Sequence, residues 1–468
     1  MRILMVYCLI TRFVVNIEIE RKAEHMTDKT LSAEEIVAYS REYTFFSWSV
    51  QAQTRPIPVA RAEGVYFWDA QGRRYLDFSS QLMNTNIGHQ HPKVVKAIQE
   101  QAARLCFVHP GNTTEVRALL GKKLAEVTPG RLKKTFFTLG GAEANENAIK
   151  LARLYTGRYK ILARYRSYHG ATYGSIALTG DSRRNAVEPA MPGVVHFLDP
   201  FCYHCPFGQE PKTCGRECIQ HLEEVISYEG ADKIAAVIME GVTGSNGIIV
   251  PPDDYWPRVR EICDKYGILL ISDEVMSGWG RTGKWFAVDH WGVEPDMITM
   301  AKGITSGYVP LGAVIVSEEI SDYFEDKFLY AGLTYNGHAL ACAAALATIA
   351  VYEEEGLIEK AAFLGNYLGE ALEDLKERHP SVGDVRSIGL FSALELVIDR
   401  ETRKPFPSAV MHAVGGFLRA QGLFTYLSTN NLGTLIFVVP PLCITRPQLD
   451  EGLNIIAQGL EIADQHVI

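Results

Sequence analysis

Six short apolar runs alternate with segments of helical spacing through the middle of the chain. The runs cover residues 135–139, 161–163, 235–239, 268–272, 297–300 and 313–316. Short apolar runs bounded by turn residues are typical of buried strands, and their alternation with amphipathic helices is typical of a parallel sheet covered on both faces. The pattern therefore predicts an α/β fold built on a mainly parallel sheet.

Most of the runs end in polar or reactive residues that a hydrophobic core does not need. Five run ends carry such groups: Gly140-Gly141-Ala142-Glu143, Tyr168-His169-Gly170, Glu240, Asp273 and Lys302. In an open parallel sheet, ligands bind beyond the carboxyl ends of the strands. We therefore expect the five groups to meet at one edge of the sheet and to form a binding site.

Lys302 follows the apolar run 297–300 and precedes a glycine-rich turn. Burial disfavours an ammonium group and lowers its pKa, and a lysine of that kind suits the formation of a Schiff base with an aldehyde. Taken alone, the stretch fits a surface lysine beyond a strand equally well. The neighbouring strand ends favour the reactive lysine.

The segment Gly140-Gly141-Ala142 leads into a strong helix-forming stretch at 143–153. A helix amino terminus offers free N–H groups and a positive dipole end to phosphate, although an ordinary strand-to-helix turn has the same pattern. Asp273 at a buried strand end needs a cationic partner, for which a protonated pyridine nitrogen would serve. With Tyr168 as an aromatic face and Lys302 as the amine, the set points to pyridoxal 5'-phosphate.

The chain has 468 residues, of which 47% are hydrophobic and 22% charged, and its formal net charge is -9. This composition fits a water-soluble protein with more than one domain, and the lack of a basic stripe argues against nucleic acid as a partner. No apolar run approaches the length that spans a bilayer, so we expect no membrane association. Nine cysteines, an odd number in a long chain, argue against a disulfide scaffold and for the cytoplasm.

Residues 1–26 differ from the rest of the chain. They contain an apolar stretch at 3–10, but only Arg2 precedes it and no small-residue cleavage site follows, which argues against a signal peptide. Met26 then begins a polar lead-in. We expect residues 1–26 to be an extension from an upstream start codon, disordered or loosely attached.

From about Trp48 to the C-terminus, the sequence resembles the class III, fold-type-I pyridoxal-phosphate aminotransferases, the group that includes amine and ω-amino-acid:pyruvate transaminases. The resemblance rests on ordered motifs: Gly88-His89-Gln90-His91-Pro92, 140–146, Tyr168-His169-Gly170, Asp273-Glu274-Val275, Gly280-Arg281-Thr282-Gly283, 296–310, 383–390 and Pro440-Pro441-Leu442. It implies a large domain at 91–345 with a mainly parallel seven-stranded sheet, a smaller α+β domain at 346–468, and an N-terminal segment, 27–90, that joins the small domain. It also implies a homodimer, or a tetramer, whose active sites are shared between subunits.

The resemblance implies a role for each matching residue. Lys302 would bind the cofactor as a Schiff base and move a proton between substrate and cofactor, and Asp273 would pair with the pyridinium nitrogen. Gly141 and Ala142 would bind the phosphate through backbone N–H groups. The remaining cofactor contacts would come from Tyr168 and Val275 on the two ring faces, Glu240 on the Asp273 side, His169, and Thr334 reaching into the site of a partner subunit.

Two departures from the family pattern bear on the substrates. Relatives that bind glutamate or 2-oxoglutarate often carry an arginine directly after the Tyr/Phe-His-Gly turn, where this chain has Ala171, and no arginine lies between Arg419 and Arg446. A second carboxylate needs a bidentate arginine. We therefore expect transfer from an amine or ω-amino acid of the β-alanine, taurine or arylalkylamine type to pyruvate. Trp48 and nearby aromatics suggest an apolar substrate mouth, although they fit an ordinary core equally well.

Other outcomes stay open. An enzyme with these motifs could use 2-oxoglutarate with a 4-aminobutyrate-like donor, or act as an aminomutase or amine lyase. Consumption of a keto acid separates the transaminases from the other two classes. A binding protein on an inactive scaffold is disfavoured, because Lys302 and Asp273 are both present.

Four cysteines form two close pairs. Cys202 and Cys205 flank His204, and Cys214 and Cys218 follow with a three-residue spacer. This spacing fits a zinc site, although similar cysteine-rich insertions in the family form a surface loop without known metal. We expect no metal here, with zinc as the alternative.

Overall fold

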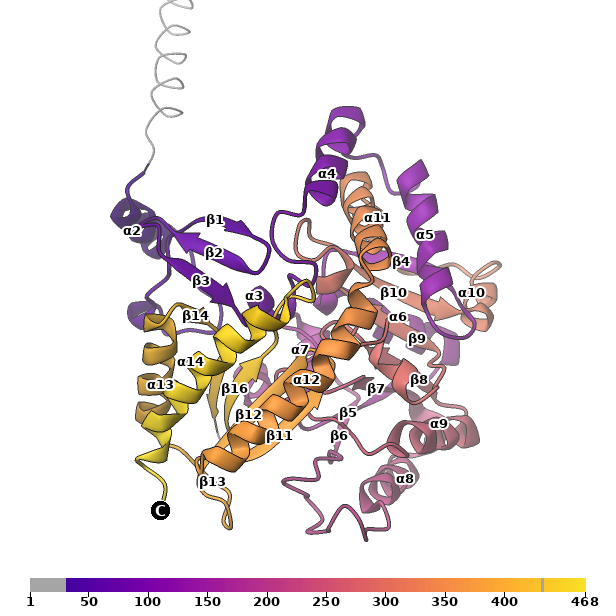
Figure 1. Ribbon diagram of the computed structural model, residues 1–468. Coiled ribbons are helices and arrows are strands. Elements are labelled where there is room, and N and C mark those ends of the chain that lie inside the picture. The colour runs from indigo at the N-terminus through magenta and orange to yellow at the C-terminus, as the bar shows by residue number, and fades with distance from the viewer. Residues whose placement is uncertain (1–30, 431–432) are drawn as a thin grey trace, which may run out of the picture. The chain divides into compact units, whose positions relative to one another are not determined.

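The computed structural model describes residues 31–430 and 433–468 (Figure 1). The described residues form two compact units: the first contains 31–62 together with 67–74, and the second contains 63–66 together with 75–430 and 433–468. The expected extension at 1–26 lies outside the described residues. Strands β1 (Val59–Glu63), β2 (Tyr66–Asp69) and β3 (Arg74–Asp77) each contribute residues to both units.

The described part of the first unit contains α2 (Ala33–Tyr43), followed by the short helix η1 (Gln51–Gln53). Ser32 and Glu35 form a capping box, in which Glu35 N donates to Ser32 Oγ at 3.1 Å and Ser32 N donates to Glu35 Oε2 at 2.9 Å. This arrangement satisfies two N–H groups that the first turn leaves free. None of the side chains described in α2 is buried, and Trp48 is 61% exposed.

The second unit contains a seven-stranded sheet in the order β4-β10-β9-β8-β7-β5-β6. Its strands are β4 (Leu132–Thr138), β5 (Lys160–Arg164), β6 (Val194–Phe197), β7 (Ile234–Glu240), β8 (Leu269–Asp273), β9 (Met297–Met300) and β10 (Gly312–Ser317). β10 is antiparallel to both of its neighbours, and the pairs from β9 through to β6 are parallel. The predicted mainly parallel, seven-stranded sheet is confirmed, and β6 is the strand that the six apolar runs did not identify.

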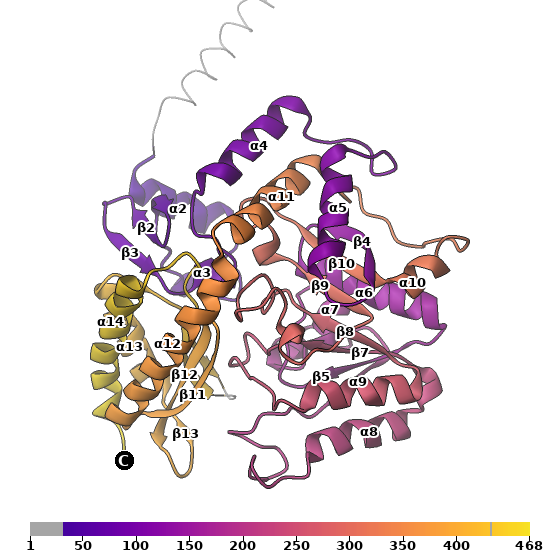
Figure 2. The same ribbon diagram turned by 45° about the vertical axis from the view of Figure 1, so that its right-hand side comes forward.

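Both faces of this sheet are covered. Every residue of β7 is buried, and its alternate side chains enter two different hydrophobic clusters, one with Val237 and Met239 and the other with Ala236 and Ile238. That pattern is expected of a central strand with helices on both faces. The helices of this part are α3 (Ser80–Met83), α4 (Pro92–Arg104), α5 (Glu115–Val127), α6 (Gly141–Thr156), α7 (Tyr173–Leu178), α8 (Glu217–Glu229), α9 (Tyr255–Tyr266), α10 (Glu318–Tyr323) and α11 (Ala339–Glu354). Figure 2 shows α8 and α9 side by side below the sheet.

The C-terminal part adds an antiparallel sheet. Its strands are β11 (Val382–Ile388), β12 (Phe391–Asp399), β16 (Gly433–Val438) and β15 (Leu427–Asn430), with β13 (Lys404–Pro405) paired to β12. Helix α12 (Leu357–Arg378) packs on β11, while α13 (Ser408–Ala420) and α14 (Arg446–Asp464) pack on each other (Figure 1). β14 (Leu423–Phe424) pairs with Leu76 and Asp77. The domain boundaries at 90 and 345 stay predictions, and residue 345 lies within α11.

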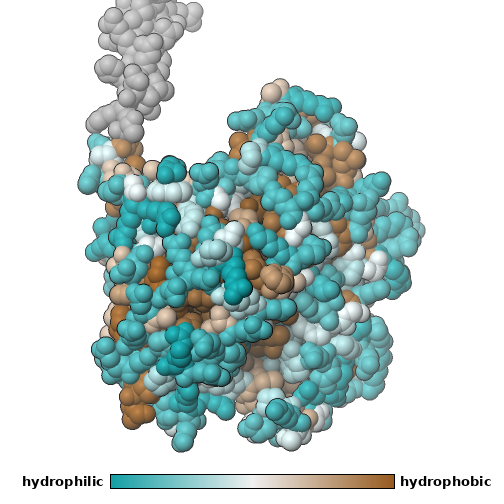
Figure 3. All heavy atoms as spheres, in the orientation of Figure 1, coloured by the Kyte–Doolittle hydropathy of each residue, from teal (hydrophilic) through white to brown (hydrophobic). Residues whose placement is uncertain are grey.

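None of the helices in the described residues is long and apolar enough to cross a membrane. The face drawn in Figure 3 carries mostly hydrophilic residues, with separate hydrophobic areas between them. The cysteines of the described residues are free thiols. The cytoplasmic location that the cysteine content suggested stays a prediction.

Candidate active site

A cavity of about 490 Å³ lies where β7, β8 and β9 end. These strands are parallel neighbours, so the polar residues at their carboxyl ends lie side by side. The cavity is lined by most of the predicted site residues: Gly141, Ala142, Tyr168, His169, Glu240, Asp273, Val275 and Lys302. Sheet topology thus brings together groups from five separate segments of the chain.

Asp273 is the last residue of β8 and is buried. Its Oδ2 atom lies 2.8 Å from Asn145 Nδ2 and 2.7 Å from His169 Nδ1, and its Oδ1 atom accepts a hydrogen bond from Val275 N at 3.0 Å. An ionised carboxylate only accepts, so Nδ1 of His169 carries the proton in this arrangement. Three donors therefore hold the carboxylate in one orientation, as a fixed partner for a cation in the cavity.

Lys302 follows β9 and begins the short helix η5 (Lys302–Ile304). Its φ angle is 46°, in the left-handed region that favours glycine, and such strain persists where the surroundings enforce it, often at functional sites. Burial lowers the pKa of the amine, and the negative charges of Asp273 and Glu240 oppose that shift without cancelling it. The amine therefore loses its proton at a lower pH than a surface lysine does, which favours nucleophilic attack.

Glu240 ends β7 and pairs in register with Asp273. Its Oε1 atom accepts from Tyr168 N at 3.0 Å, and its Oε2 atom accepts from Gly244 N at 2.7 Å. Burial raises the pKa of Glu240, and the neighbouring Asp273 charge adds to the shift. The carboxyl group of Glu240 thus joins the backbone of Tyr168 to the turn that follows β7.

The turn between β4 and α6 contains the predicted phosphate site. Helix α6 begins at Gly141, and no side chain of the described residues caps its first N–H groups. A Cβ atom at position 141 would lie 2.7 Å from Val275 Cγ1, so only glycine allows this close approach. The cavity wall includes Gly140, Gly141 and Ala142. Uncapped N–H groups and the positive end of the helix dipole at that wall suit a phosphate group.

Tyr168 reaches the cavity from the loop after β5. The Cζ atom of Arg183 lies 4.0 Å from the centre of the Tyr168 ring, a cation–π contact. Arg183 donates from Nε to Asp181 Oδ1 at 2.9 Å and from Nη2 to Ser245 Oγ at 2.9 Å. Glu240 therefore holds the backbone of Tyr168, and Arg183 contacts its ring.

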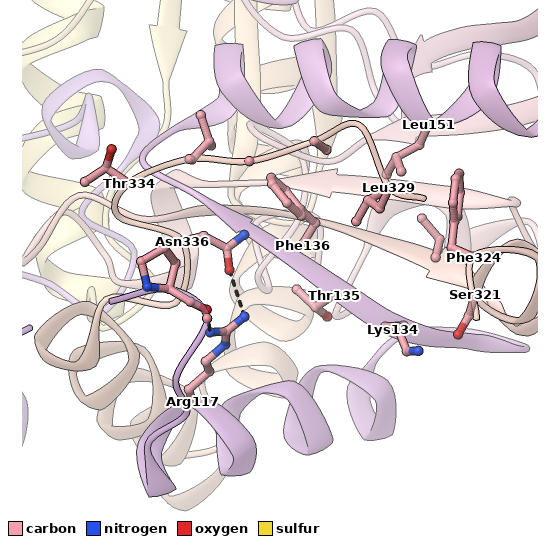
Figure 4. A pocket seen from close by; sticks show the side chains of 16 residues that line it. Arg117, Lys134, Thr135, Phe136, Leu151, Ser321, Phe324, Leu329, Thr334 and Asn336 are labelled. Carbon is pink, nitrogen blue, oxygen red and sulfur yellow. Dashed lines mark hydrogen bonds between the residues drawn. The ribbon is translucent and has the colours of Figure 1, made fainter. Parts of the chain in front are cut away.

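Two predicted site residues are not among those that line this cavity. Thr334 lines a separate cavity of about 640 Å³, together with Arg117 and Asn336 (Figure 4). Arg117 Nη2 donates to Asn336 Oδ1 at 3.0 Å, and Asn336 Nδ2 donates to Phe137 O at 2.9 Å, so the segment that carries Thr334 is held on β4. Trp48 belongs to the first unit.

Sequence reasoning missed several residues of the site. Asn145, on α6, donates to Asp273 and is fully buried. The only sequence signal for it is an amide on a helix face that is otherwise apolar. Leu82 and Asn84 line the cavity from α3 and its end. The residues of α3 have positive φ angles between 46° and 72°, an arrangement that L-residues rarely adopt. No local sequence pattern predicted it.

The residues of the cavity wall are relevant to the keto acid that was predicted as amino acceptor. Ala171 is part of the wall, and no arginine is found among the described residues that line it. Arg164, at the end of β5, is fully buried and donates from Nη2 to Glu240 O at 2.9 Å. The wall therefore offers no guanidinium to a second carboxylate in the described part of the chain.

The clustered cysteines surround a small cavity of about 20 Å³ between β6 and α8. Arg216 Nη1 donates to Cys214 Sγ at 2.8 Å, and His204 Nε2 lies 2.5 Å from Glu395 Oε1, on β12. In the part of the chain that the structure describes, no three His, Cys, Asp or Glu side chains are arranged to hold a metal ion. His204 therefore joins the cysteine-rich segment to the C-terminal sheet.

Comparison with known proteins gave consistent matches over most of the chain. Residues 48–460 match the model of the class-III aminotransferase family. A solved structure of taurine:2-oxoglutarate aminotransferase from Bifidobacterium kashiwanohense, in complex with PLP and glutamate, is 44% identical, with a TM-score of 0.89 over 94% of this chain and 100% of that one. Leucine/methionine racemase from Thermococcus litoralis is 40% identical over 90% of this chain and 94% of its own length. Taurine–pyruvate aminotransferase from Bilophila wadsworthia is 35% identical over 90% and 96%.

Proposed function

The chain belongs to the class-III aminotransferases, which use pyridoxal phosphate, and we propose that it transfers an amino group from an amine or ω-amino acid to pyruvate. The observation that supports this most is the single cavity lined by Lys302, Asp273 and the Gly141 turn. These residues have the chemistry that the cofactor needs, namely a nucleophilic amine, a carboxylate of fixed orientation and free N–H groups.

Each residue has a defined task in this proposal. When bound, pyridoxal phosphate supplies an aldehyde that attaches amines and a ring that withdraws electrons from the attached carbon. Lys302 binds the cofactor through Nζ and afterwards carries the proton that leaves the substrate carbon. Asp273 keeps a proton on the ring nitrogen, with its orientation set by Asn145 and His169. The uncapped N–H groups at the start of α6 bind the phosphate.

The choice of pyruvate rests on the missing arginine. A distal carboxylate such as that of 2-oxoglutarate is held best by a bidentate guanidinium. Ala171 lies in the cavity wall, at the position after the Tyr-His-Gly turn where the family resemblance implies such an arginine. Pyruvate carries only the carboxylate beside the reacting carbon, which smaller hydrogen-bond donors can hold. The taurine–pyruvate aminotransferase among the relatives supports the same acceptor and a taurine- or β-alanine-like donor.

Transfer to 2-oxoglutarate is the second candidate. The solved relative that is 44% identical is named as a taurine:2-oxoglutarate aminotransferase and was crystallised with glutamate. If this chain shares that acceptor, an arginine outside the described cavity wall has to reach the distal carboxylate. Racemisation, which the name of another relative states, and the aminomutase or lyase outcomes would consume no keto acid.

We further propose a homodimer with shared active sites. Thr334 is exposed and lines the 640 Å³ cavity rather than the cavity of Lys302. Near it in the chain, Phe328 and Tyr330 are 74% and 68% exposed. Large aromatic side chains on a surface commonly mark a protein interface. A second copy that covers this surface would bring Thr334 to the phosphate site of its partner.

Steady-state kinetics with one good amine donor and the two acceptors test the proposed function. We expect kcat/KM for pyruvate to exceed that for 2-oxoglutarate by at least about tenfold, the effect of one charged hydrogen bond. Ala171→Arg should raise the use of 2-oxoglutarate, whereas Ala171→Met, a control of similar length without charge, should not. Equal or better use of 2-oxoglutarate by the wild type would overturn the choice of pyruvate, and turnover without any keto acid would overturn the transaminase proposal.

A further inference from the structure

The turn at residues 243–249, which follows β7, has a strained backbone. Thr243 and Ile249 pair across it, with N···O distances of 3.2 and 3.0 Å. Ile248 is fully buried and has a φ angle of 52°, which a β-branched residue adopts only where its surroundings enforce it. We call residues 243–249 the latch turn.

The latch turn holds Tyr168 through two routes. Gly244 N donates to Glu240 Oε2 at 2.7 Å, and the other oxygen of that carboxyl group accepts from Tyr168 N at 3.0 Å. Ser245 Oγ accepts from Arg183 Nη2 at 2.9 Å, and the guanidinium of Arg183 lies 4.0 Å from the centre of the Tyr168 ring. The first route fixes the backbone of Tyr168 and the second fixes its ring.

Asn246, the next residue of the latch turn, adds a further contact to the second route, through Arg183. Asn246 Nδ2 donates to Asp181 Oδ2 at 3.0 Å, and Asp181 is the carboxylate that accepts from Arg183 Nε at 2.9 Å. Asp181 and Asn246 are both buried. A shift of the latch turn would therefore move Arg183 both directly and through Asp181.

Arg386, on β11, holds the latch turn from the C-terminal sheet. Its Nε atom donates to Gly247 O at 2.6 Å, and its Nη1 atom donates to Asp384 Oδ2 at 2.6 Å and to Glu395 Oε2 at 2.8 Å. Arg386 and Glu395 are 8% and 2% exposed. Charges buried to this degree depend on their partners, so the guanidinium has little freedom to leave Gly247.

We propose that Arg386 is a positioning residue for the cofactor ring and acts on Tyr168 through the latch turn. The inference rests on the proposed contact between Tyr168 and that ring. Arg386 is not among the described residues that line the Lys302 cavity, so its effect is indirect. By fixing Gly247, it fixes Gly244 and Ser245, and through them both supports of Tyr168.

The test compares Arg386→Gln with Arg400→Gln in the full-length chain. Arg400 follows β12 and donates to Val382 O at 2.9 Å and to His379 O at 2.8 Å, and none of its described hydrogen bonds involves the latch turn. Two quantities are measured without substrate: the visible circular dichroism of bound pyridoxal phosphate, and hydrogen exchange of the 243–249 peptide in the cofactor-free protein. The dichroism reports on the surroundings of the bound ring and the exchange reports on the latch turn, whereas activity alone distinguishes neither.

Arg386→Gln should reduce the visible dichroism, speed exchange in the latch turn, and weaken cofactor binding by about tenfold or more, as expected for one charged hydrogen bond. Arg386→Lys, which keeps the charge, should recover part of the loss. Arg400→Gln should lower the melting temperature while leaving the dichroism and the exchange at wild-type values.

Arg386→Gln could fail to fold, because it takes the guanidinium from Asp384 and leaves Glu395 with His204 as its remaining partner. A second variant keeps the test decisive in that case. Asn246→Ala breaks the link to Asp181 without removing a charge, and should change the dichroism in the same direction. Wild-type dichroism and exchange in a folded Arg386→Gln variant or, should that variant not fold, in Asn246→Ala would overturn the inference, and so would equal losses in Arg400→Gln. A wild-type chain that binds no cofactor would contradict the proposed function instead.

Discussion

His169 Nδ1 lies 2.7 Å from Asp273 Oδ2, and both side chains are buried at the floor of the cavity that Lys302 lines. The contact joins a loop residue to a strand end more than a hundred positions later. Together with the hydrogen bonds from Asn145 and Val275, this contact restricts the carboxylate of Asp273 to one orientation. A carboxylate fixed in this way can pair with a cationic ring nitrogen without first reorganising.

Asp273→Asn should retain the cofactor but slow transamination by about 100-fold or more, the usual cost of losing one preorganised electrostatic partner. The amide carries no charge, so it cannot keep the ring nitrogen protonated. Single-turnover kinetics of each half-reaction measure the effect. Near-native turnover in Asp273→Asn would mean that another residue partners the ring nitrogen.

Lys302→Ala should fold and yet lose all transamination, because no other described lysine lines the cavity. Borohydride treatment of the wild type should remove the visible absorbance of the bound cofactor and leave a stable mass adduct on the Lys302 peptide. Lys265→Ala, which removes an exposed amine paired with Glu223, serves as the control and should keep the adduct. A wild-type adduct on any other lysine would contradict the assignment of Lys302.

Glu274 predicts a pH dependence of stability. It is fully buried, and burial raises its pKa from 4.5 to about 7. The folded state therefore holds a proton that the unfolded state has released, so the stabilisation is complete below pH 4.5 and is lost as the pH rises through about 7. Each unit of pKa difference corresponds to about 1.4 kcal/mol.

Melting temperatures at about pH 5 and about pH 8 test the role of Glu274, because the two values bracket its titration. Glu274→Gln should show a smaller change in melting temperature between them than the wild type. Glu370→Gln, at an exposed position on α12, should keep the wild-type change. The same pH dependence in wild type and Glu274→Gln would show that another group is responsible.

Thr334 is expected to act on the site of a partner subunit. Thr334→Ala should weaken cofactor binding by about tenfold or more, since it removes one hydrogen bond to a charged phosphate. Mixed dimers of Thr334→Ala with Lys302→Ala would then contain one complete site, formed by Lys302 of one subunit and Thr334 of the other. Mixing the two variants should restore tight cofactor binding, and no recovery after subunit exchange would place Thr334 in its own chain's site or in none.

The residues whose place in the fold could be predicted from the sequence are those whose signal is local. Lys302 and Asp273 each end a short apolar run, and a strand end in a parallel sheet has a predictable place at the binding edge. The six runs also gave the strands to within a few residues, because buried strands are short and apolar on both faces. β6 was missed because a histidine, His196, interrupts its apolar residues Val194–Phe197.

The residues that sequence reasoning missed depend on contacts between distant segments. Arg183 contacts the Tyr168 ring and is held by Asp181, two positions before it, and by Ser245, 62 positions after it. The contact with Ser245 has no signal in the residues around Arg183. Arg386 was part of a recognised motif, but its contact with Gly247 crosses 139 positions. The left-handed backbone of α3 is likewise set by its surroundings rather than by its own residues.

The close approach of Gly141 to Val275 limits how this enzyme can change. An alanine at 141 would place its Cβ atom 2.7 Å from Val275 Cγ1 and 2.8 Å from Cγ2, so the larger residue is excluded while valine remains. Conversely, a smaller residue at 275 would free space that only a new side chain at 141 could refill. The two positions are therefore coupled, because any side chain larger than glycine at 141 needs a smaller residue at 275.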